Sequence, residues 1–366
     1  MNKLINIFRK LQVLSVLLIP LISIIFIILL VLLLSDTPLK TLYYYFMGPF
    51  VNIFHFGNMF NASVPFIIGA LGITSAMKAG SLNLGGEGQV YLGAFLSTII
   101  ALYFSKSFIG QQMGIFASII AIICGSFFSA IASAFSGYCK AKWNANELIT
   151  SFLLSCAIIP IVNFLVTGPF ADPDTSLLST GKIAENMRFA LILKPSALNA
   201  SVFAAILLAA LIHIFLFKTR TGYEIRITGL NEMFARYGGI NTKFYTVLTM
   251  AISGFMYGLA GSAVVFGTNY AVIKDFSSGL GWSALTTALF AGFSPLAIIP
   301  CALFLSWINA GARIAMQNSD ITFEIAYIVQ AVIFILSTSF IVKNSVLKEK
   351  LLTDIKNFHF FKKRNI

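Results

Sequence analysis

The chain has 366 residues, of which 58% are hydrophobic and only 10% are charged, and its formal net charge is +12 at pH 7. Charged residues usually make up about a quarter of a soluble domain, so this composition excludes a soluble globular protein. No polar block is long enough for a separate soluble domain, and the sequence predicts a single integral-membrane domain over residues 1–366.

Apolar runs predict an all-α, polytopic transmembrane bundle of about ten spans over residues 13–342. The first run, Val13–Leu34, carries no charge and is long enough to cross a hydrocarbon core of about 30 Å. Its length, and the lack of a small-residue cleavage site after it, favour a retained span over a signal peptide. Nine further spans are expected at Met59–Met77, Gln89–Phe104, Met113–Gly137, Asn146–Thr167, Asn199–Phe217, Phe244–Val265, Leu280–Phe293, Leu296–Ala312 and Phe323–Val342.

A glycine-rich break follows the second of these spans. Ala79–Phe95, AGSLNLGGEGQVYLGAF, holds five glycines and one carboxylate, Glu87. Backbone groups at membrane depth need partners inside the protein, so such a break is expected to line a cavity or to be buried by other helices. An ionisable side chain inside a membrane is a functional candidate. The alternative is a tight turn between two spans, with Glu87 at the water interface.

The segment Lys218–Phe244 is the largest internal basic loop. Within it, Glu232–Tyr237 is expected to form a short helix, with Asn231 as its N-cap. Gly238 or Gly239 would supply the left-handed residue that ends the helix. Such a helix could dock on a soluble partner, or the loop could only set topology.

Basic residues support an orientation with both termini in the cytoplasm. With ten spans and the N-terminus inside, cytoplasmic segments hold 18 of the 25 Lys and Arg, seven of them in the tail 343–366. This asymmetry is what the positive-inside rule expects. Orientation and contact of the lipid bilayer with the basic segments account for the net charge, so no nucleic-acid partner is predicted.

The chain lacks the motifs of several enzyme and metal-protein classes. It has no GxxxxGK[ST] loop, no HExxH, no CxxC and no GxSxG. The four cysteines lie in or beside apolar spans and are expected to act as small hydrophobic residues. The sequence therefore predicts neither an enzyme nor a metal site, and any ATP that drives the protein must be bound by another chain.

Four segments, in the same order as in the family, resemble permeases of the ABC importers for branched-chain amino acids, ribose and nucleosides. Three of them are GSLNLGGEGQVYLGAF, GYEIRITGLNEMFARYGGI and GLGWSALTTALFAGFSP. The fourth, NANELITSFLLS at residues 144–155, is similar to the nucleoside-type permeases that pair with basic-membrane-protein lipoproteins. The chain differs from many relatives in having Phe234-Ala235 where they have two alanines, and Leu154-Ser155 where the nucleoside type often has Leu-Asn.

The resemblance implies a permease subunit in a bacterial cytoplasmic (inner) membrane. A second permease subunit, identical or not, would complete the pathway, and separate ABC ATPase subunits would dock on the cytoplasmic loop 218–244. An extracytoplasmic solute-binding lipoprotein would deliver a nucleoside, with purine nucleosides expected first. The candidates for ATPase coupling are Arg226, Gly229, Asn231, Glu232, Arg236, Gly238 and Gly239.

Candidate pathway residues cluster at the glycine break, at the start of the fifth span and in the second half of the chain. Glu87 could contact the solute or accept hydrogen bonds from backbone amides. Tyr270 and Trp282, with Asn269 nearby, could stack on a base or a sugar, or could anchor the protein at the membrane interface. The full set is Asn83, Gly85, Gly86, Glu87, Gln89, Asn146, Glu147, Tyr270 and Trp282.

Three alternatives to a nucleoside importer stay open. A sugar such as ribose is the second expectation for the solute, and a branched-chain amino acid is the third. An ion-coupled secondary transporter would need membrane-embedded carboxylates, for which only Glu87 and Glu147 qualify.

Overall fold

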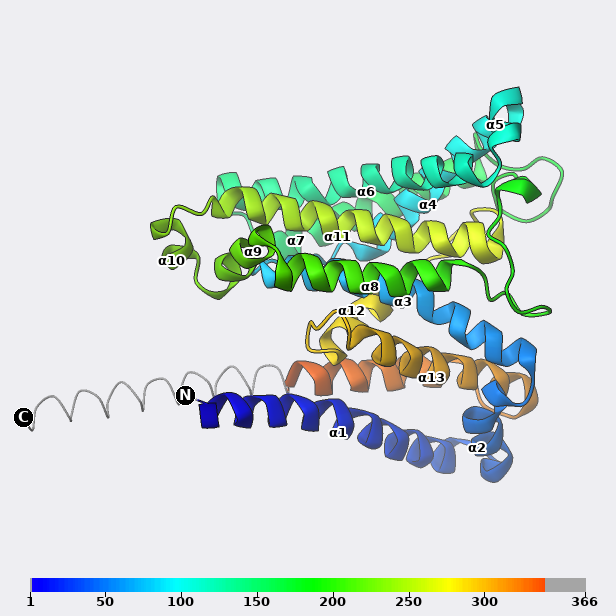
Figure 1. The fold of residues 1–366 in the computed structure, drawn as a ribbon. Coiled ribbons are helices and arrows are strands. Elements are labelled where there is room, and N and C mark those ends of the chain that lie inside the picture. Colours follow the sequence, from blue (N-terminus) through cyan, green and yellow to red (C-terminus); the bar gives the residue numbers. More distant parts are fainter. Residues whose placement is uncertain (1, 340–366) are drawn as a thin grey trace, which may run out of the picture.

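The computed structural model describes residues 2–339 (Figure 1). In that range the chain is almost entirely helical, and three isolated antiparallel bridges are its only extended pairings. The α-helices are α1 (Asn2–Leu34), α2 (Pro38–Met47), α3 (Ile53–Lys78), α4 (Gly86–Lys106), α5 (Phe108–Met113), α6 (Ile115–Trp143), α7 (Glu147–Thr167), α8 (Ser201–Lys218), α9 (Arg220–Leu230), α10 (Glu232–Tyr237), α11 (Thr242–Val264), α12 (Leu280–Phe290), α13 (Ile298–Asn318) and a final unlabelled helix, Glu324–Ser339.

Each of the ten expected apolar segments overlaps a helix in its described part, and apart from the start of α1 the ends differ by up to six residues. Among residues 2–339, seven helices are long and apolar enough to cross a membrane: α3, α4, α6, α7, α8, α11 with its extension to Asn269, and α13. Three shorter apolar helices, Leu18–Leu34, α12 and Glu324–Ser339, account for the others. The protein is therefore a multi-pass helical membrane protein. The basic tail 343–366 lies outside the described residues.

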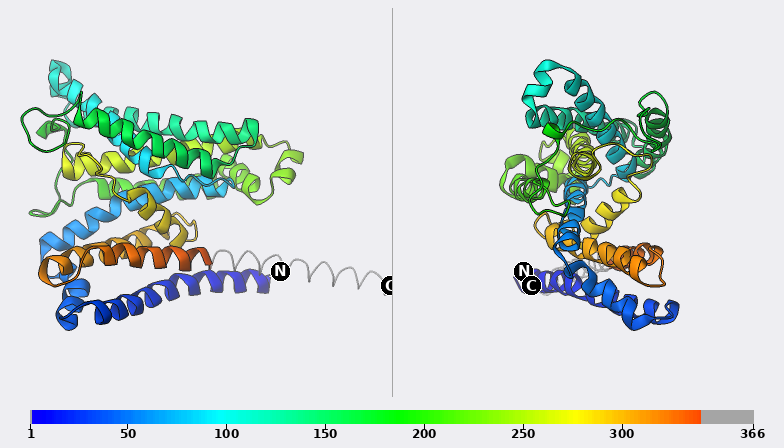
Figure 2. Two further views of the ribbon diagram at one scale, coloured as in Figure 1. Left: turned by 180° about the vertical axis from the view of Figure 1, so that it is seen from behind. Right: turned by 90° about the vertical axis from the view of Figure 1, so that its right-hand side faces the viewer.

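The long helices run side by side along one direction (Figures 1 and 2). Helices α9 and α10 lie at one end of the bundle, and α2 and α5 lie at the other. Helix α3 occupies the centre, where 83% of its apolar window is buried, compared with 22% for α7 and 28% for α8. A central α3 is consistent with its mostly small and apolar residues, which allow neighbours on all sides.

Small residues hold α4, α6 and α11 together. A Cβ on Gly258 would lie 2.7 Å from the Ser126 Cα, and a Cβ on Gly254 would lie 2.5 Å from the Ser133 Cβ, so only glycine permits this approach. The Ser97 and Ser262 hydroxyls lie 2.9 Å apart between α4 and α11. In lipid, the hydrophobic effect contributes little to the association of helices, which is stabilised by close backbone packing and by interhelical hydrogen bonds.

Short helices account for the main departures from the predicted pattern. The expectation of one short helix in the segment 218–244 is incomplete, because a second helix, α9 of 11 residues, precedes α10. The Thr219 hydroxyl caps α9 by accepting from the Gly222 amide at 3.0 Å. Helices α2 and α5 also lie in segments that hydropathy leaves between spans, where they are too short to give a strong apolar signal.

A single carboxylate joins the end of α13 to the turn between α1 and α2. Asp320, just after α13, accepts hydrogen bonds from the Ser35 hydroxyl at 2.8 Å and the Asp36 amide at 2.5 Å. It also accepts from the Thr37 hydroxyl at 3.1 Å. These hydrogen bonds, led by that of Ser35, hold the pKa of Asp320 below its usual value because they stabilise the charged form.

Candidate functional site

The glycine break is buried by other helices, one of the two arrangements expected for it. Asn83 is fully buried. Its amide nitrogen, which has two hydrogens, lies within hydrogen-bonding distance of three acceptors: Gln89 Oε1 at 2.7 Å, Ser133 Oγ at 2.9 Å and Ser253 Oγ at 3.1 Å. Its Oδ1 accepts from the Gly85 amide at 2.9 Å. Asn83 and Gln89 therefore join the break to α6 and α11, and neither lines the large cavity described below.

The glycines of the break permit close packing. A Cβ on Gly86 would lie 2.6 Å from the Tyr257 hydroxyl, and a Cβ on Gly85 would lie 2.5 Å from the Gln89 amide nitrogen. Helix α7 closes the other side, where Ser151 Oγ accepts from the Leu84 amide at 3.1 Å. Side chains at Gly85 and Gly86 would displace these neighbours.

Glu87 links the two halves of the chain. Its Oε1 accepts from the Gly279 amide and its Oε2 accepts from the Gly281 amide, both at 2.6 Å. Gly279 has the left-handed φ of +82° and precedes α12, so the carboxylate caps the N-terminus of that helix. Charged caps at a helix N-terminus are favourable because the first amides lack partners within the helix. Of the two roles expected for Glu87, the geometry matches the backbone acceptor.

Asn146 and Glu147 lie at the turn between α6 and α7. Asn146 Oδ1 caps α7 by accepting from the Leu148 amide at 2.9 Å. Glu147 forms an ion pair with Lys140 at 2.6 Å, and the same ammonium donates to the Gly80 carbonyl at 2.9 Å. The ion pair of Lys140 and Glu147 therefore connects the glycine break with α6 and α7. It lies at the end of the bundle where α9 and α10 lie.

Tyr270 and Trp282 have different surroundings. Helix α11 continues as a π-helical turn, Val265–Asn269, and ends at Tyr270 with the left-handed φ of +56°. The Arg188 guanidinium lies 4.5 Å from the centre of the Tyr270 ring and covers one face of it. Tyr270 lines the large cavity, whereas Trp282 lines a small recess of about 10 Å³ beside Glu87.

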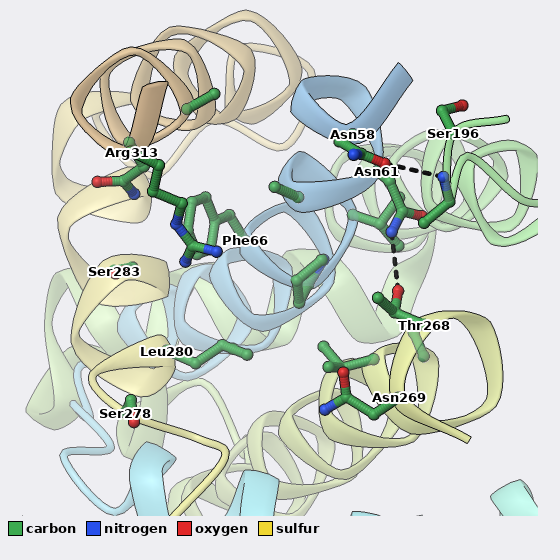
Figure 3. A pocket seen from close by; sticks show the side chains of 18 of the residues that line it. Asn58, Asn61, Phe66, Ser196, Thr268, Asn269, Ser278, Leu280, Ser283 and Arg313 are labelled. Carbon is green, nitrogen blue, oxygen red and sulfur yellow. Dashed lines mark hydrogen bonds between the residues drawn. The ribbon is translucent and has the colours of Figure 1, made fainter. Parts of the chain in front are cut away.

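The large cavity, of about 740 Å³, lies between α3, the π-helical end of α11, the start of α12 and α13 (Figure 3). Its polar lining is rich in amides. Asn61 donates to the Thr268 hydroxyl at 2.9 Å, whereas Asn269, Asn309 and Gln317 form no side-chain hydrogen bond with another described residue.

Aromatic rings and one cation complete the lining. The rings are those of Phe54, Phe66, Tyr270, Phe276, Phe323 and Tyr327. The Arg313 guanidinium lies 5.3 Å from the centre of the Phe323 ring, and no Asp or Glu lines the described cavity. Pockets of this size with aromatic walls and a few polar groups are typical small-molecule sites. This lining suits a neutral, hydrogen-bonding ring system.

Sequence reasoning missed most of this cavity. The expected ninth span ended at Ala312 and placed Arg313 in an external segment, but α13 continues to Asn318. Asn309, Arg313 and Gln317 are spaced four residues apart and share one helix face. That spacing of polar residues within an apolar helix is the signal that could have identified the site.

The candidate coupling segment protrudes at the opposite end of the bundle from α2 and α5. Asn231 Oδ1 caps α10 by accepting from the Phe234 amide at 2.9 Å, as predicted. Glu232 and Arg236 form an ion pair at 2.5 Å on the exposed side of α10. Helix α10 has Gly238 as its C-cap, and the next residue, Gly239, has the left-handed φ of +78°, also as predicted.

Two other coupling candidates face inward. The Gly229 Cα packs against the end of α3, where a Cβ would lie 2.8 Å from the Gly80 amide nitrogen. The Arg226 guanidinium lies 4.9 Å from the centre of the Phe217 ring of α8. Among the described residues, no group of three His, Cys, Asp or Glu side chains could hold a metal ion.

Comparison with known proteins agrees with this architecture. The family described as "Branched-chain amino acid transport system / permease component" matches residues 56–338. The chain is 30% identical to the Probable riboflavin import permease protein RfuC of Treponema pallidum, over 83% of this chain and 79% of that protein. It is 29% identical to the Nucleoside ABC transporter permease protein NupB of Lactococcus lactis, over 79% and 80% of the two chains.

A third relative is the Guanosine ABC transporter permease protein NupP of Bacillus subtilis, 26% identical over 80% of this chain and 83% of that protein. The family match covers well over half of the chain, and it runs from the first turn of α3 to beyond the end of α13. Members of this family are transport proteins and not enzymes. The chain therefore belongs to the branched-chain amino acid type family of ABC transporter permeases.

Proposed function

We propose that this permease forms the translocation pathway of an ATP-driven importer for nucleosides, and that the large cavity is its solute site. The observation that carries the proposal is the lining, which combines aromatic rings with uncommitted amides and lacks a described carboxylate. A nucleobase stacks on aromatic rings and pairs its edges with amides. The names of NupB and NupP, which refer to nucleoside and guanosine, support this solute class.

Riboflavin is the second candidate, because it combines a flat heterocycle with a chain of hydroxyls and RfuC is named for its import. The same lining would bind either solute. Sugars and branched-chain amino acids lack the large aromatic surface that these rings complement.

Conformational changes of the ATPase would reach the permease through α9 and α10. In this proposal the exposed side of α10, with Glu232 and Arg236, contacts a separate ABC ATPase, while Asn231, Gly238 and Gly239 shape the helix. Gly229 and Arg226 would transmit the displacement to α3 and α8, which they touch. A second permease and an extracytoplasmic solute-binding lipoprotein would complete the assembly in a bacterial inner membrane.

The proposed arrangement has ten spans with both termini in the cytoplasm. The cavity would then open towards the outside, since α9 and α10 lie at the far end of the bundle. The residues of the glycine break would fix the position of α12 relative to α4, α6 and α11; they are Asn83, Gly85, Gly86, Glu87 and Gln89. Asn146 and Glu147 would stabilise the turn between α6 and α7.

The direct test is uptake of labelled guanosine by cells that express the chain with its partner ATPase and binding protein. Excess unlabelled adenosine, riboflavin, ribose or leucine serves as competitor. We expect competition by adenosine and no uptake with a hydrolysis-deficient ATPase. Uptake of riboflavin, ribose or leucine in place of guanosine would overturn the solute, and uptake independent of the ATPase would overturn the coupling.

A further inference from the structure

Four side chains form a cluster where α3, α8 and α9 meet. Phe217, near the end of α8, lies at its centre. The Lys78 ammonium lies 5.9 Å and the Arg226 guanidinium 4.9 Å from the centre of its ring, and the His213 ring is centred 5.0 Å away. We call these four residues the Phe217 cluster.

The cations of the Phe217 cluster have no acidic partner within residues 2–339. Neither Lys78 nor Arg226 takes part in any of the ion pairs formed among the described residues. Glu224, the carboxylate of α9, is engaged by Arg220 at 3.0 Å and by the Tyr245 hydroxyl. Two half-buried positive charges on one ring repel each other and are costly unless an anion joins them.

Two buried nitrogens point to the same conclusion. Arg226 Nε and His213 Nδ1 are both inaccessible to solvent and form no hydrogen bond in the described structure. Buried polar atoms without partners are rare in proteins, and each such atom calls for an explanation. Since both lie around one ring, a single oxygen-rich ligand could satisfy them together.

The place of the cluster favours a lipid. Lys78 is the last residue of α3, and His213 and Phe217 belong to the last turns of α8, where a membrane helix meets the headgroups. Leu211 and Ile214 beside them are half exposed on the outer face of α8, as expected of lipid-facing residues. The Arg226 side chain turns back onto α8, whereas Glu232 and Arg236 lie on the exposed part of α10.

We propose that the Phe217 cluster binds the phosphate of an anionic phospholipid at the cytoplasmic face of the membrane. The phosphate oxygens would accept from Arg226, Lys78 and His213, and the acyl chains would lie along α8. Basic pockets between membrane helices bind headgroups in this way. The proposal is independent of the transported solute.

The test uses the purified full-length chain in a neutral detergent. Native mass spectrometry measures binding of dioleoyl phosphatidylglycerol and of dioleoyl phosphatidylcholine. We expect the wild type to prefer phosphatidylglycerol. The double variant Lys78→Gln/Arg226→Gln should bind it about thirtyfold more weakly, which corresponds to about 1 kcal/mol for each of the two basic residues removed. The control Lys243→Gln removes an exposed charge outside the cluster and should keep the wild-type affinity.

Arg226→Lys, which retains the charge, should bind the lipid more tightly than Arg226→Gln, and it also serves if the double variant does not fold. Equal phosphatidylglycerol affinity in wild type and double variant would overturn the proposal. Displacement of the lipid by millimolar inorganic phosphate would assign the cluster to a free phosphate. Unchanged lipid affinity with lost capture of the ATPase subunit would assign it to the protein interface.

Discussion

Glu87 shows how one carboxylate can determine the relative position of two segments nearly 200 residues apart. Both of its oxygens accept backbone amides at the start of α12, and both bonds are charge-assisted. Glu87 lines the small recess together with Tyr257 and Gly281, and it does not line the large cavity. These two bonds hold the start of α12, which contributes Leu280 and Ser283 to the cavity wall.

Glu87→Gln is expected to destabilise the protein without changing its solute preference. The amide keeps one acceptor but turns an NH₂ group towards a backbone N–H, which costs about 1–3 kcal/mol for a buried unsatisfied donor. Thermal unfolding of the purified variant should begin at a lower temperature. The ratio of guanosine to adenosine uptake should equal that of the wild type. A changed ratio with unchanged stability would mean that Glu87 contacts the solute.

Asn269→Ala is expected to weaken solute binding. The Asn269 amide lines the cavity at the π-helical end of α11 and forms no side-chain hydrogen bond with another described residue. Loss of one hydrogen bond to a neutral solute, worth about 1 kcal/mol, should raise the KM of uptake about fivefold. Asn318→Ala, at the end of α13 and outside the cavity lining, is the control. An equal rise in KM for both variants would argue against this site.

At the scale of elements, hydrogen-bonded links at helix ends set the positions of the helices. Asp320 joins the α1–α2 turn to the end of α13. Asn146 and Lys140 join α6, α7 and the glycine break. Such links replace long-range apolar packing in a lipid environment, where burial of apolar surface gives little preference between helix arrangements.

The Asp320 link should make stability depend on pH in the acid range. Its pKa is lowered in the folded state, so its contribution is present above the unfolded value of about 3.9 and is lost as the pH falls below it. Thermal midpoints measured from pH 6 to pH 3 should fall more steeply for the wild type than for Asp320→Asn. Asp174→Asn, in the segment between α7 and α8, should behave like the wild type. Parallel curves for all three proteins would contradict the link.

Gly239→Pro tests the end of α10. Proline fixes φ near −65°, whereas Gly239 has a φ of +78° and its amide donates to the Arg236 carbonyl at 3.0 Å. We expect the variant to insert into the membrane normally but to lose most ATP-driven uptake and stimulation of the partner ATPase. Gly239→Asn, which tolerates the left-handed region, should retain most of the uptake. Normal uptake by the proline variant would remove α10 from the coupling assignment.

At the scale of the whole molecule, the bundle separates two kinds of surface. The lining of the amide-lined cavity includes Leu191 and Pro195–Ala197 of the segment between α7 and α8. Helices α9 and α10 lie at the end of the bundle opposite to α2 and α5 (Figure 1). A permease has to couple a solute site on one side with an energy source on the other. This polarity of the molecule supports that division of roles.

The orientation can be measured by labelling single cysteines in a variant without the four native cysteines. Ser176→Cys, in the exposed segment after α7, should react with an impermeant maleimide in intact cells. Tyr237→Cys, which replaces a side chain that is 86% exposed on α10, should react only after permeabilisation. The reverse pattern of labelling would show that the proposed topology is inverted. Equal labelling of both cysteines in intact cells would indicate leaky cells. A cytoplasmic protein with one accessible cysteine, which should not react in intact cells, is the control for leakage.

The sequence by itself determined the class of the protein and the ten apolar segments, because hydropathy depends on local composition. It also determined the cap at Asn231 and the left-handed Gly239, because capping depends on residues a few positions apart. The sequence did not decide between the two alternative roles of Glu87, solute contact and backbone acceptor. Its amide partners, Gly279 and Gly281, are nearly 200 residues away, and no local sequence pattern connects them with Glu87. Only the tertiary structure decided that Asn83 and Gln89 are buried and that Asn61, Asn269 and Arg313 meet around one cavity. These three residues belong to α3, the end of α11 and α13, which are far apart along the chain, and only the packing of those helices brings them to one cavity.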